Sequence, residues 1–471
     1  MSAPGAPSLA RRYAIIGGLL AAAVAIALTT PPAGLTPVAM QAAALCVLCI
    51  GLWATAVVPE HVPAMVFFVL AMAGAVAPPE VVFSGFASSA MWLVLGGLVL
   101  GVATTRSGLG AWLAGLFLAR VGGGYPTMVL ATVLGATALA FLVPSSMARM
   151  VILTPIVIAV AERLGFGAGS TGRTGLVLAS VTTTFLVPTT ILPANLPNVV
   201  LLGMADTIYG AVPGYWEYLL MHFPLSGAVK GVLLALVICR TFPAEIAAAS
   251  PAAAATEPPT LGRDGRRLLA VLCVALALWM TDSWHGIAPG WIATAAAIVC
   301  LLPGIDLVPP DAFRRDVSLS AIVYTGGVLG VGALVAHAGL GVAVADVVLG
   351  RLQLGPDQPG LAFAAFSGLT SLLTFFATNP GAVAIMTPLA EGAARVADLP
   401  LMTMLMCIVN GFSVAAFPYQ AAPLVIGLAL GQVGFAPATR VLLPVALASW
   451  LVLWPLTYLW WSALGRMSPV G

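Results

Sequence analysis

The chain has 471 residues, of which 61% are hydrophobic and 7% are charged, and its net charge is +2. This composition excludes an ordinary soluble protein and is typical of a polytopic membrane protein. The small net charge and the scattered basic residues give no indication of a nucleic-acid partner.

Apolar segments long enough to cross a bilayer fill nearly the whole chain. We expect about 11 transmembrane helices, at residues 13–30, 36–57, 61–77, 88–119, 175–207, 222–240, 267–283, 287–303, 318–338, 401–430 and 439–464. The remaining apolar segments, 126–163 and 359–395, are predicted to enter and leave the membrane on one side as re-entrant helical hairpins. The sequence therefore predicts an all-α polytopic membrane protein.

The predicted hairpins carry helix-breaking residues at corresponding places. One contains LVPSSMARMVILTPI at 142–156, and the other contains FATNPGAVAIMTPL at 376–389. Proline and small hydroxyl residues interrupt a helix, and non-helical backbone survives in a bilayer only when it is buried in protein or lines a polar cavity. Matching interruptions in two halves of a chain indicate a transport site near the membrane midplane.

A pair of proline-interrupted helices accompanies the hairpins. The segments PTTILPANLPNVV at 188–200 and SVAAFPYQAAPLVI at 413–426 align Pro193 with Pro418, an offset of 418 − 193 = 225. We therefore expect each half to bring a hairpin tip and an unwound helix to mid-bilayer.

The arginines favour a cytoplasmic N-terminus, because that orientation puts most of them on the inner side of the cell (inner) membrane. It also places the two hairpins on opposite faces, so the halves are predicted to be inverted-topology repeats. The expected organisation is an N-terminal helix (1–30), a first repeat (31–240), a cytoplasmic linker (241–266) and a second repeat (267–471). Each repeat is expected to contain scaffold helices (36–119 and 267–338), a hairpin (126–163 and 359–395), a broken helix (175–207 and 401–430) and a last helix (222–240 and 439–464).

From about Trp53 to Leu430, the chain resembles the divalent anion/sodium symporter family of secondary transporters, within the ion transporter superfamily. The resemblance rests on WATAVVPEHVPAMVFFVL at 53–70, FSGFASSAMWLVLGGLVLGVATTRSGL at 83–109, the hairpin tips, and the PANLPN and PYQAAP segments. It implies a sodium-coupled carrier of a small anion (a di- or tricarboxylate, a sulfonate or a sulfate-like ion). It also implies a homodimer in which the hairpins and broken helices move against a fixed scaffold, as an elevator.

The residues at the tips and unwound helices, together with this resemblance for the sodium ligands, predict a set of binding residues. Those expected to bind substrate are Ser145, Ser146, Met147, Arg149, Asn195, Thr378, Asn379, Pro380 and Gln420. Those expected to bind sodium, the one cofactor implied, are Ser145, Ser146, Ala194, Thr378, Asn379 and Tyr419. The tips depart from the family's Ser-Asn-Thr pattern, because Ser146, Met147 and Pro380 replace its asparagine and two of its threonines.

Individual polar residues leave alternatives open. Arg149 either meets the anion or is neutralised by Glu162 or by unwound carbonyls and braces its hairpin. Asn198 either binds substrate or caps a half-helix, and Lys230 is expected to snorkel to the outer interface.

The function also has alternatives. One is a sodium-independent anion exchanger, or another carrier of the superfamily that moves arsenite or exchanges sodium for protons. Another is a membrane enzyme or scaffold that keeps the fold without transport. The chain has no HExxH, G-x-S-x-G or Walker sequence, which favours a protein that is not an enzyme and has no organic cofactor.

Overall fold

Helices are the only regular elements in the part of the chain that the computed structural model describes, which is residues 8–32, 35–55, 57–119, 124–246, 260–340, 355 and 357–468. Seven of them are long and apolar enough to cross a membrane, and six shorter apolar helices accompany them. The expected all-α polytopic fold is confirmed.

The first half begins with scaffold helices and continues into the first hairpin and the first broken helix. Its elements are α1 (Leu9–Leu28), α2 (Pro37–Thr55), α3 (His61–Ala73), α4 (Pro79–Val82), α5 (Ser84–Ala87), α6 (Ser89–Ser107), α7 (Leu109–Ala119), α8 (Tyr125–Leu142), α9 (Ser146–Arg163), α10 (Thr171–Leu186), η1 (Val187–Thr190), η2 (Leu192–Ala194), α11 (Leu196–Tyr209), α12 (Tyr215–His222), the π-helical turn η3 (Phe223–Val229) and α13 (Lys230–Thr241).

The second half repeats this order. Its elements are α14 (Arg263–Met280), α15 (Asp282–His285), α16 (Pro289–Leu301), α17 (Pro310–Asp316), α18 (Leu319–His337), α20 (Pro359–Leu373), α21 (Asn379–Met386), η5 (Thr387–Leu389), α22 (Ala390–Ala397), α23 (Leu401–Phe412), η6 (Pro418–Gln420), α24 (Ala422–Gly431), α25 (Phe435–Ala448), the π-helical turn η7 (Ser449–Leu453) and α26 (Trp454–Ala463).

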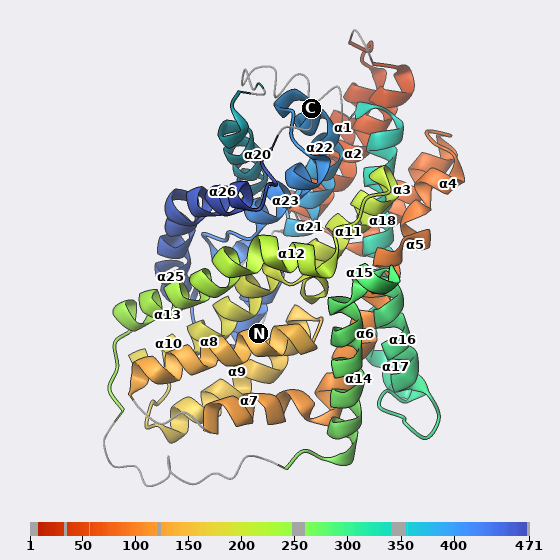
Figure 1. The fold of residues 1–471 in the computed structure, drawn as a ribbon. Helices are drawn as coiled ribbons and strands as arrows, with labels where there is room; N and C mark the ends of the chain where they lie inside the picture. Colours follow the sequence, from red (N-terminus) through yellow and green to blue (C-terminus); the bar gives the residue numbers. More distant parts are fainter. Residues whose placement is uncertain are drawn as a thin grey trace.

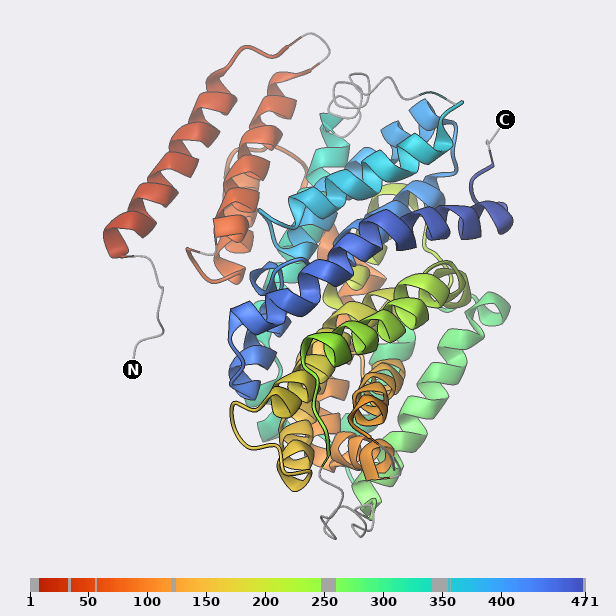
Figure 2. The same cartoon turned by 90° about the vertical axis from the view of Figure 1, so that its left-hand side faces the viewer.

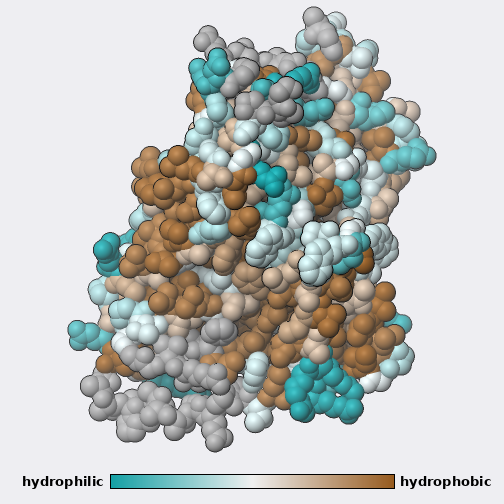
Figure 3. All heavy atoms as spheres, in the orientation of Figure 1, coloured by the Kyte–Doolittle hydropathy of each residue, from teal (hydrophilic) through white to brown (hydrophobic). Residues whose placement is uncertain are grey.

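The hairpins approach the middle of the molecule from opposite ends. In Figures 1 and 2 the α8–α9 pair lies toward the lower end and the α20–α22 group toward the upper end. Helix α9 packs on α8, and α21 and α22 pack on α20, as re-entrant hairpins require. Hydrophobic side chains cover broad areas of the face in Figure 3, as expected where lipid contacts the protein.

The helix boundaries depart from the predicted spans in one scaffold segment. The span expected at 88–119 is two helices, α6 and α7, because Gly108 adopts a left-handed conformation (φ 72°) that ends α6. Half of the predicted linker, 241–266, lies outside the described residues, since the structure does not describe residues 247–259.

Close helix packing in the scaffold depends on glycine. Helices α6 and α16 are neighbours, and a Cβ atom at Gly96 would lie 2.7 Å from the backbone carbonyl carbon of Ala293. A Cβ atom at Gly290 would fall on the carbonyl oxygen of Ser89. Small residues that let backbones approach are a common means of packing helices in membranes.

We predict that Gly290→Ala destabilises the protein by about 1–3 kcal/mol, because the added methyl group forces α6 and α16 apart. The measurement is the thermal unfolding midpoint of the purified protein in detergent. Gly18→Ala is the matched control, since a Cβ atom there meets nothing within 4 Å. Equal midpoints for the two variants would contradict the packing argument.

Candidate functional site

The first hairpin tip is a short extended segment between two helices. Helix α8 ends at Leu142 and α9 begins at Ser146, with Pro144 between them. Ser145 caps α9, because its Oγ atom accepts a hydrogen bond from the backbone N–H of Ala148 at 3.2 Å. A Cβ atom at Gly101 of α6 would lie 3.3 Å from that of Ser145, so the tip packs against the glycine-rich face of a scaffold helix.

The second tip has the same construction. Helix α20 ends at Leu373 and α21 begins at Asn379. Thr378 caps α21, because its Oγ1 atom accepts from the N–H of Gly381 at 3.3 Å, and Pro380 occupies the first turn, where its missing donor does no harm. Both tips therefore end in a capped helix N-terminus, which carries positive partial charge.

The two tips border one cavity of about 700 Å³. Of the residues predicted to bind substrate, the structure brings eight to its wall: Ser145, Ser146, Met147, Asn195, Thr378, Asn379, Pro380 and Gln420. Tyr419, predicted as a sodium ligand, also lines it, whereas Ala194 and Arg149 lie outside the lining. Two segments more than 200 residues apart in the sequence thus meet at one pocket.

Asn195 and Gln420 occupy equivalent positions in the two unwound helices but bond differently. Asn195 is 4% exposed, and its side-chain Nδ2 donor has no hydrogen-bond acceptor among the described residues. The Oε1 atom of Gln420 accepts from the N–H groups of Ala416 and Phe417, both at 2.7 Å, and its Nε2 atom donates to Thr374 at 3.0 Å. Gln420 therefore holds the unwound backbone, while Asn195, a residue of the cavity lining, has a buried donor that remains without an acceptor among the described residues.

Arg149 is fully buried behind the first tip, and backbone carbonyls take its hydrogen bonds. Its guanidinium donates to the carbonyl oxygen of Ala194 at 2.9 Å, to that of Thr184 at 3.4 Å and to that of Val143, and to Ser146 Oγ at 3.0 Å.

Glu162 does not neutralise Arg149. Its carboxylate pairs with Arg173 at 2.9 Å. Of the alternatives for Arg149, the geometry favours bracing by unwound carbonyls over contact with an anion.

Sequence comparison agrees with this architecture. The chain matches the family described as the sodium:sulfate symporter transmembrane region over residues 11–467. It belongs to that family. The predicted resemblance to the divalent anion/sodium symporters is confirmed.

Relatives and a solved structure extend the comparison. A Cupriavidus necator protein described as a membrane protein is 24% identical over 486 residues, covering 98% of this chain and 94% of the relative. The inner membrane protein YbhI of Escherichia coli is 24% identical over 375 residues, covering 75% and 76%. The structure of the Alcanivorax borkumensis YdaH transporter has a similar fold, with a TM-score of 0.56 and 16% identity over 92% of this chain and 100% of that chain.

The family description names sodium, so the expected sodium ligands must have oxygen atoms that are free to bind the ion. At the first tip they do not fit, because Arg149 already donates to two of them, Ser146 Oγ and the Ala194 carbonyl. At the second tip the Nδ2 atom of Asn379 donates to the Phe412 carbonyl at 3.2 Å, and its buried Oδ1 atom has no partner among the described residues. An unpartnered oxygen of this kind is a suitable sodium ligand.

The cavity also has a scaffold wall that the sequence did not reveal. Trp53, Glu60 and Tyr324 line it from α2, from the turn before α3 and from α18. Trp53 donates its Nε1–H to the Glu60 carbonyl at 2.9 Å and packs edge-on against Tyr324, with ring centroids 5.5 Å apart. Burial raises the pKa of the Glu60 carboxyl group, and the neighbouring His61 opposes this in part.

The prediction that Lys230 snorkels to the outer interface is wrong. Its side chain is 1% exposed, and its ammonium group donates to the carbonyl oxygen of Ser413 at 3.0 Å and to the Ser413 hydroxyl at 3.3 Å. The π-helical turn η3, directly before Lys230, changes which face the following residues present.

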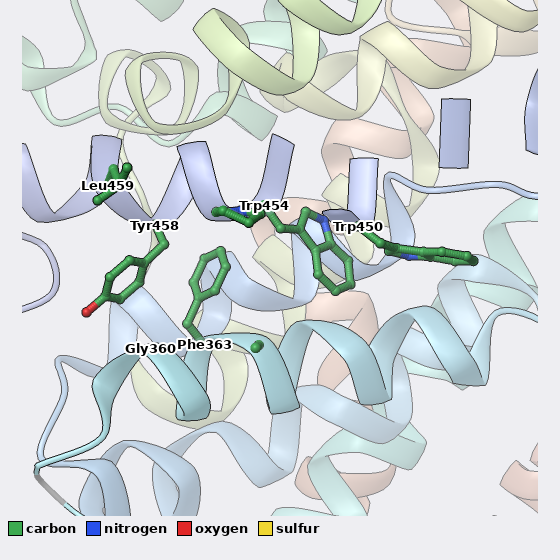
Figure 4. A pocket seen from close by; sticks show the side chains of 8 residues that line it. Gly360, Phe363, Trp450, Trp454, Tyr458 and Leu459 are labelled. Carbon is green, nitrogen blue, oxygen red and sulfur yellow. The ribbon is translucent and has the colours of Figure 1, made fainter. Parts of the chain in front are cut away.

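A smaller cavity of about 340 Å³ lies between α20 and the α26 region. Aromatic side chains dominate it: Figure 4 shows Phe363 of α20 beside Tyr458 and Trp454, and the Phe363 and Tyr458 rings are 5.8 Å apart in an edge-on arrangement. Polar groups do not converge there, so the larger cavity is the candidate site for an anion.

We predict that Asn198→Ala lowers stability by about 1–3 kcal/mol, because Asn198 Nδ2 donates to the carbonyls of Pro188 at 3.2 Å and Ile191 at 2.9 Å. In the alanine variant both carbonyls lose the Asn198 amide as a donor. The thermal midpoint in detergent is the measurement. Asn195→Ala is the control, since the Asn195 donor has no partner to lose, and a larger loss in that variant would contradict the bracing role of Asn198.

Proposed function

We propose that this protein is a secondary active transporter that binds a small anion in the cavity between the two hairpin tips. The observation that carries the proposal is the meeting of two capped helix N-termini with the unpaired amide donor of Asn195 at one cavity. Helix N-termini and amide N–H groups stabilise negative charge. Di- and tricarboxylates, sulfonates and sulfate fit this chemistry.

Transport would follow alternating access by an elevator movement. The hairpins, the broken helices and the last helix of each half form the moving body, and the remaining helices form the scaffold within a homodimer in the inner membrane, with the N-terminus in the cytoplasm. In support, the cavity is lined on one side by tips and unwound segments and on the other by scaffold residues such as Leu93 and Tyr324. A site at such a boundary is exposed first to one side of the membrane and then to the other when one body slides past the other.

Two modes of coupling remain candidates. Sodium symport is supported by the family description and by the free Oδ1 atom of Asn379, with Thr378 and the Tyr419 carbonyl as further ligands. Sodium-independent exchange of anions is supported by Arg149, whose guanidinium holds the oxygens expected to bind sodium at the first tip.

We predict that the purified protein is stabilised against heat by at least one of succinate, citrate, a sulfonate or sulfate. Asn195→Ala should weaken that anion's apparent affinity about tenfold, because a hydrogen bond to a charged group is worth about 1.5–3 kcal/mol. Titrations by thermal shift in sodium and in choline buffers measure both quantities. The control is Asn198→Ala, which should lower the midpoint without a comparable change in affinity.

If none of these anions stabilises the protein in either buffer, anion binding is contradicted. Stabilisation that requires sodium would favour symport, and stabilisation that is equal in choline would favour exchange.

We also predict that sulfate binds more tightly as the pH falls through the raised pKa of Glu60. Above that pKa the carboxylate at the cavity wall repels an anion, and protonation removes the repulsion. Sulfate is a suitable probe because it stays fully ionised over this range. Glu60→Gln should bind sulfate with the low-pH affinity throughout.

The control for Glu60 is His61→Gln, because the His61 imidazole is the ionisable side chain next to Glu60 in the sequence. His61 Nδ1 lies 2.7 Å from Ser320 Oγ, a contact that glutamine can keep. If His61→Gln flattens the pH profile and Glu60→Gln does not, Glu60 is not the responsible group.

A further inference from the structure

Several large apolar side chains stay exposed although they line the candidate site. Phe376 at the second tip is 71% exposed, and Tyr419 in the second unwound helix is 54% exposed. Met147 at the first tip and Ile426 on α24 line the same cavity and are exposed as well. Apolar surface that faces water in a cavity is stabilised when a ligand covers it. These side chains therefore indicate a ligand that has an apolar part.

The aromatic part of this wall is held in place by ring contacts. Tyr419 stacks on Phe417, with ring centroids 5.7 Å and planes 10° apart. Phe417 in turn packs edge-on against Phe375, with centroids 6.1 Å apart, and Phe375 precedes Phe376 in the chain. A ring that is already packed on one side loses little conformational freedom when a ligand covers its exposed part. The second tip and its unwound helix thus form a fixed surface for an apolar or aromatic group.

Each tip places an apolar side chain close to a capped helix N-terminus. Met147 is two residues from Ser145, whose Oγ atom caps α9. Phe376 is two residues from Thr378, whose Oγ1 atom caps α21. An anionic group is stabilised at helix N-termini, so an anion bound there has the rest of its molecule beside Met147 and Phe376. The site therefore suits a ligand with a charged end and an apolar body.

The described lining is less suited to a second negative charge. Glu60 is the one residue of that lining with a charged side chain, and an ionised glutamate repels an anion. Carboxylates and sulfonates are usually recognised by arginine or lysine. Arg149 does not serve here, because it lies behind the first tip and donates to carbonyls and to Ser146. A ligand with a single anionic group therefore fits the described residues better than one with two.

We propose that the substrate is an organic monoanion with an aromatic body: its sulfonate or carboxylate group lies at the two tips, and its ring lies against Tyr419, Phe376 and Met147. The inference rests on the proposed transport of an anion through this cavity and narrows the class of that anion. The cavity volume of about 700 Å³ lies within the range of pockets that hold organic ligands, about 300–1,000 Å³. A sulfate ion would leave most of that volume, and the exposed rings, to water.

The test compares sulfonates that differ in the apolar body and in the number of charges, because a sulfonate stays ionised throughout the neutral pH range. Thermal-shift titrations of the purified full-length protein measure the apparent affinities for methanesulfonate, benzenesulfonate and meta-benzenedisulfonate. We expect benzenesulfonate to bind about tenfold more tightly than either of the others, because burial of a ring is worth about 1.4 kcal/mol or more. Benzenesulfonamide, a neutral analogue, should not stabilise the protein.

Variants of the wall separate recognition of the ring from recognition of the charge. Tyr419→Ala should weaken benzenesulfonate binding about tenfold and methanesulfonate binding less than about twofold, because only the ring loses a contact. Phe376→Ala truncates an exposed side chain and should act in the same direction, so it replaces Tyr419→Ala if that variant does not fold. Asn195→Ala should weaken both sulfonates by the same factor. Tyr458→Ala is the matched control, since it removes a tyrosine from the smaller aromatic cavity and should change neither affinity.

Uptake of labelled benzenesulfonate into liposomes that contain the protein completes the test. Saturable uptake that Tyr419→Ala or Phe376→Ala slows would support the inference, and binding without uptake would overturn it.

The remaining outcomes separate this inference from the proposed function. If sulfate, succinate or methanesulfonate binds as tightly as benzenesulfonate, the inference fails while anion binding stands. The inference also fails if benzenesulfonamide binds equally well, or if neither wall variant changes the preference for the ring. If no anion among these and citrate binds or enters the vesicles, the proposed function itself is contradicted.

Discussion

Backbone polar groups that are released where a helix breaks inside a membrane must find new partners, because lipid offers none. In this protein that requirement shapes the centre of the molecule. Asn198 supplies donors to two carbonyls of the first unwound helix, and Gln420 supplies an acceptor to two N–H groups of the second. With these partners, each chain segment can stay extended and bring its own polar atoms to the cavity. The broken helices and the polar atoms that they bring to the cavity are thus consequences of one constraint.

The positions of the breaks were predictable from the sequence, because proline has a strong and local effect. Pro144 and Pro380 mark the tips, and Pro193 and Pro418 mark the unwound helices, where the structure has short 3-10 turns. Proline lacks the backbone donor and clashes with the preceding turn, so these residues favour a helix start or a break where they stand. The prediction that the breaks in the two halves converge on a single cavity also agrees with the structure.

The partners of the central side chains were harder to predict, because they depend on how each helix is rotated. Lys230 follows a π-helical turn, and an extra residue in that turn redirects every side chain after it. Pro155, in contrast, lies inside α9 without ending it. The scaffold wall was missed for another reason: Trp53 and Tyr324 are more than 250 residues apart, and neither belongs to an interrupted segment. Ordinary helix-packing residues give no local signal of the cavity that they face.

The distribution of charge around the cavity bears on the proposed elevator movement. The two capped helix N-termini and the buried Arg149 lie at the tips, whereas Glu60, the one acidic residue of the described lining, belongs to the turn before α3. An anion in the cavity is therefore attracted by one wall and repelled by the other. If the attractive groups were divided between the two walls, sliding one wall past the other would pull the anion from half of its partners. In the proposed elevator movement, attractive groups gathered on one wall would move together with the anion and leave the opposite wall at little energetic expense.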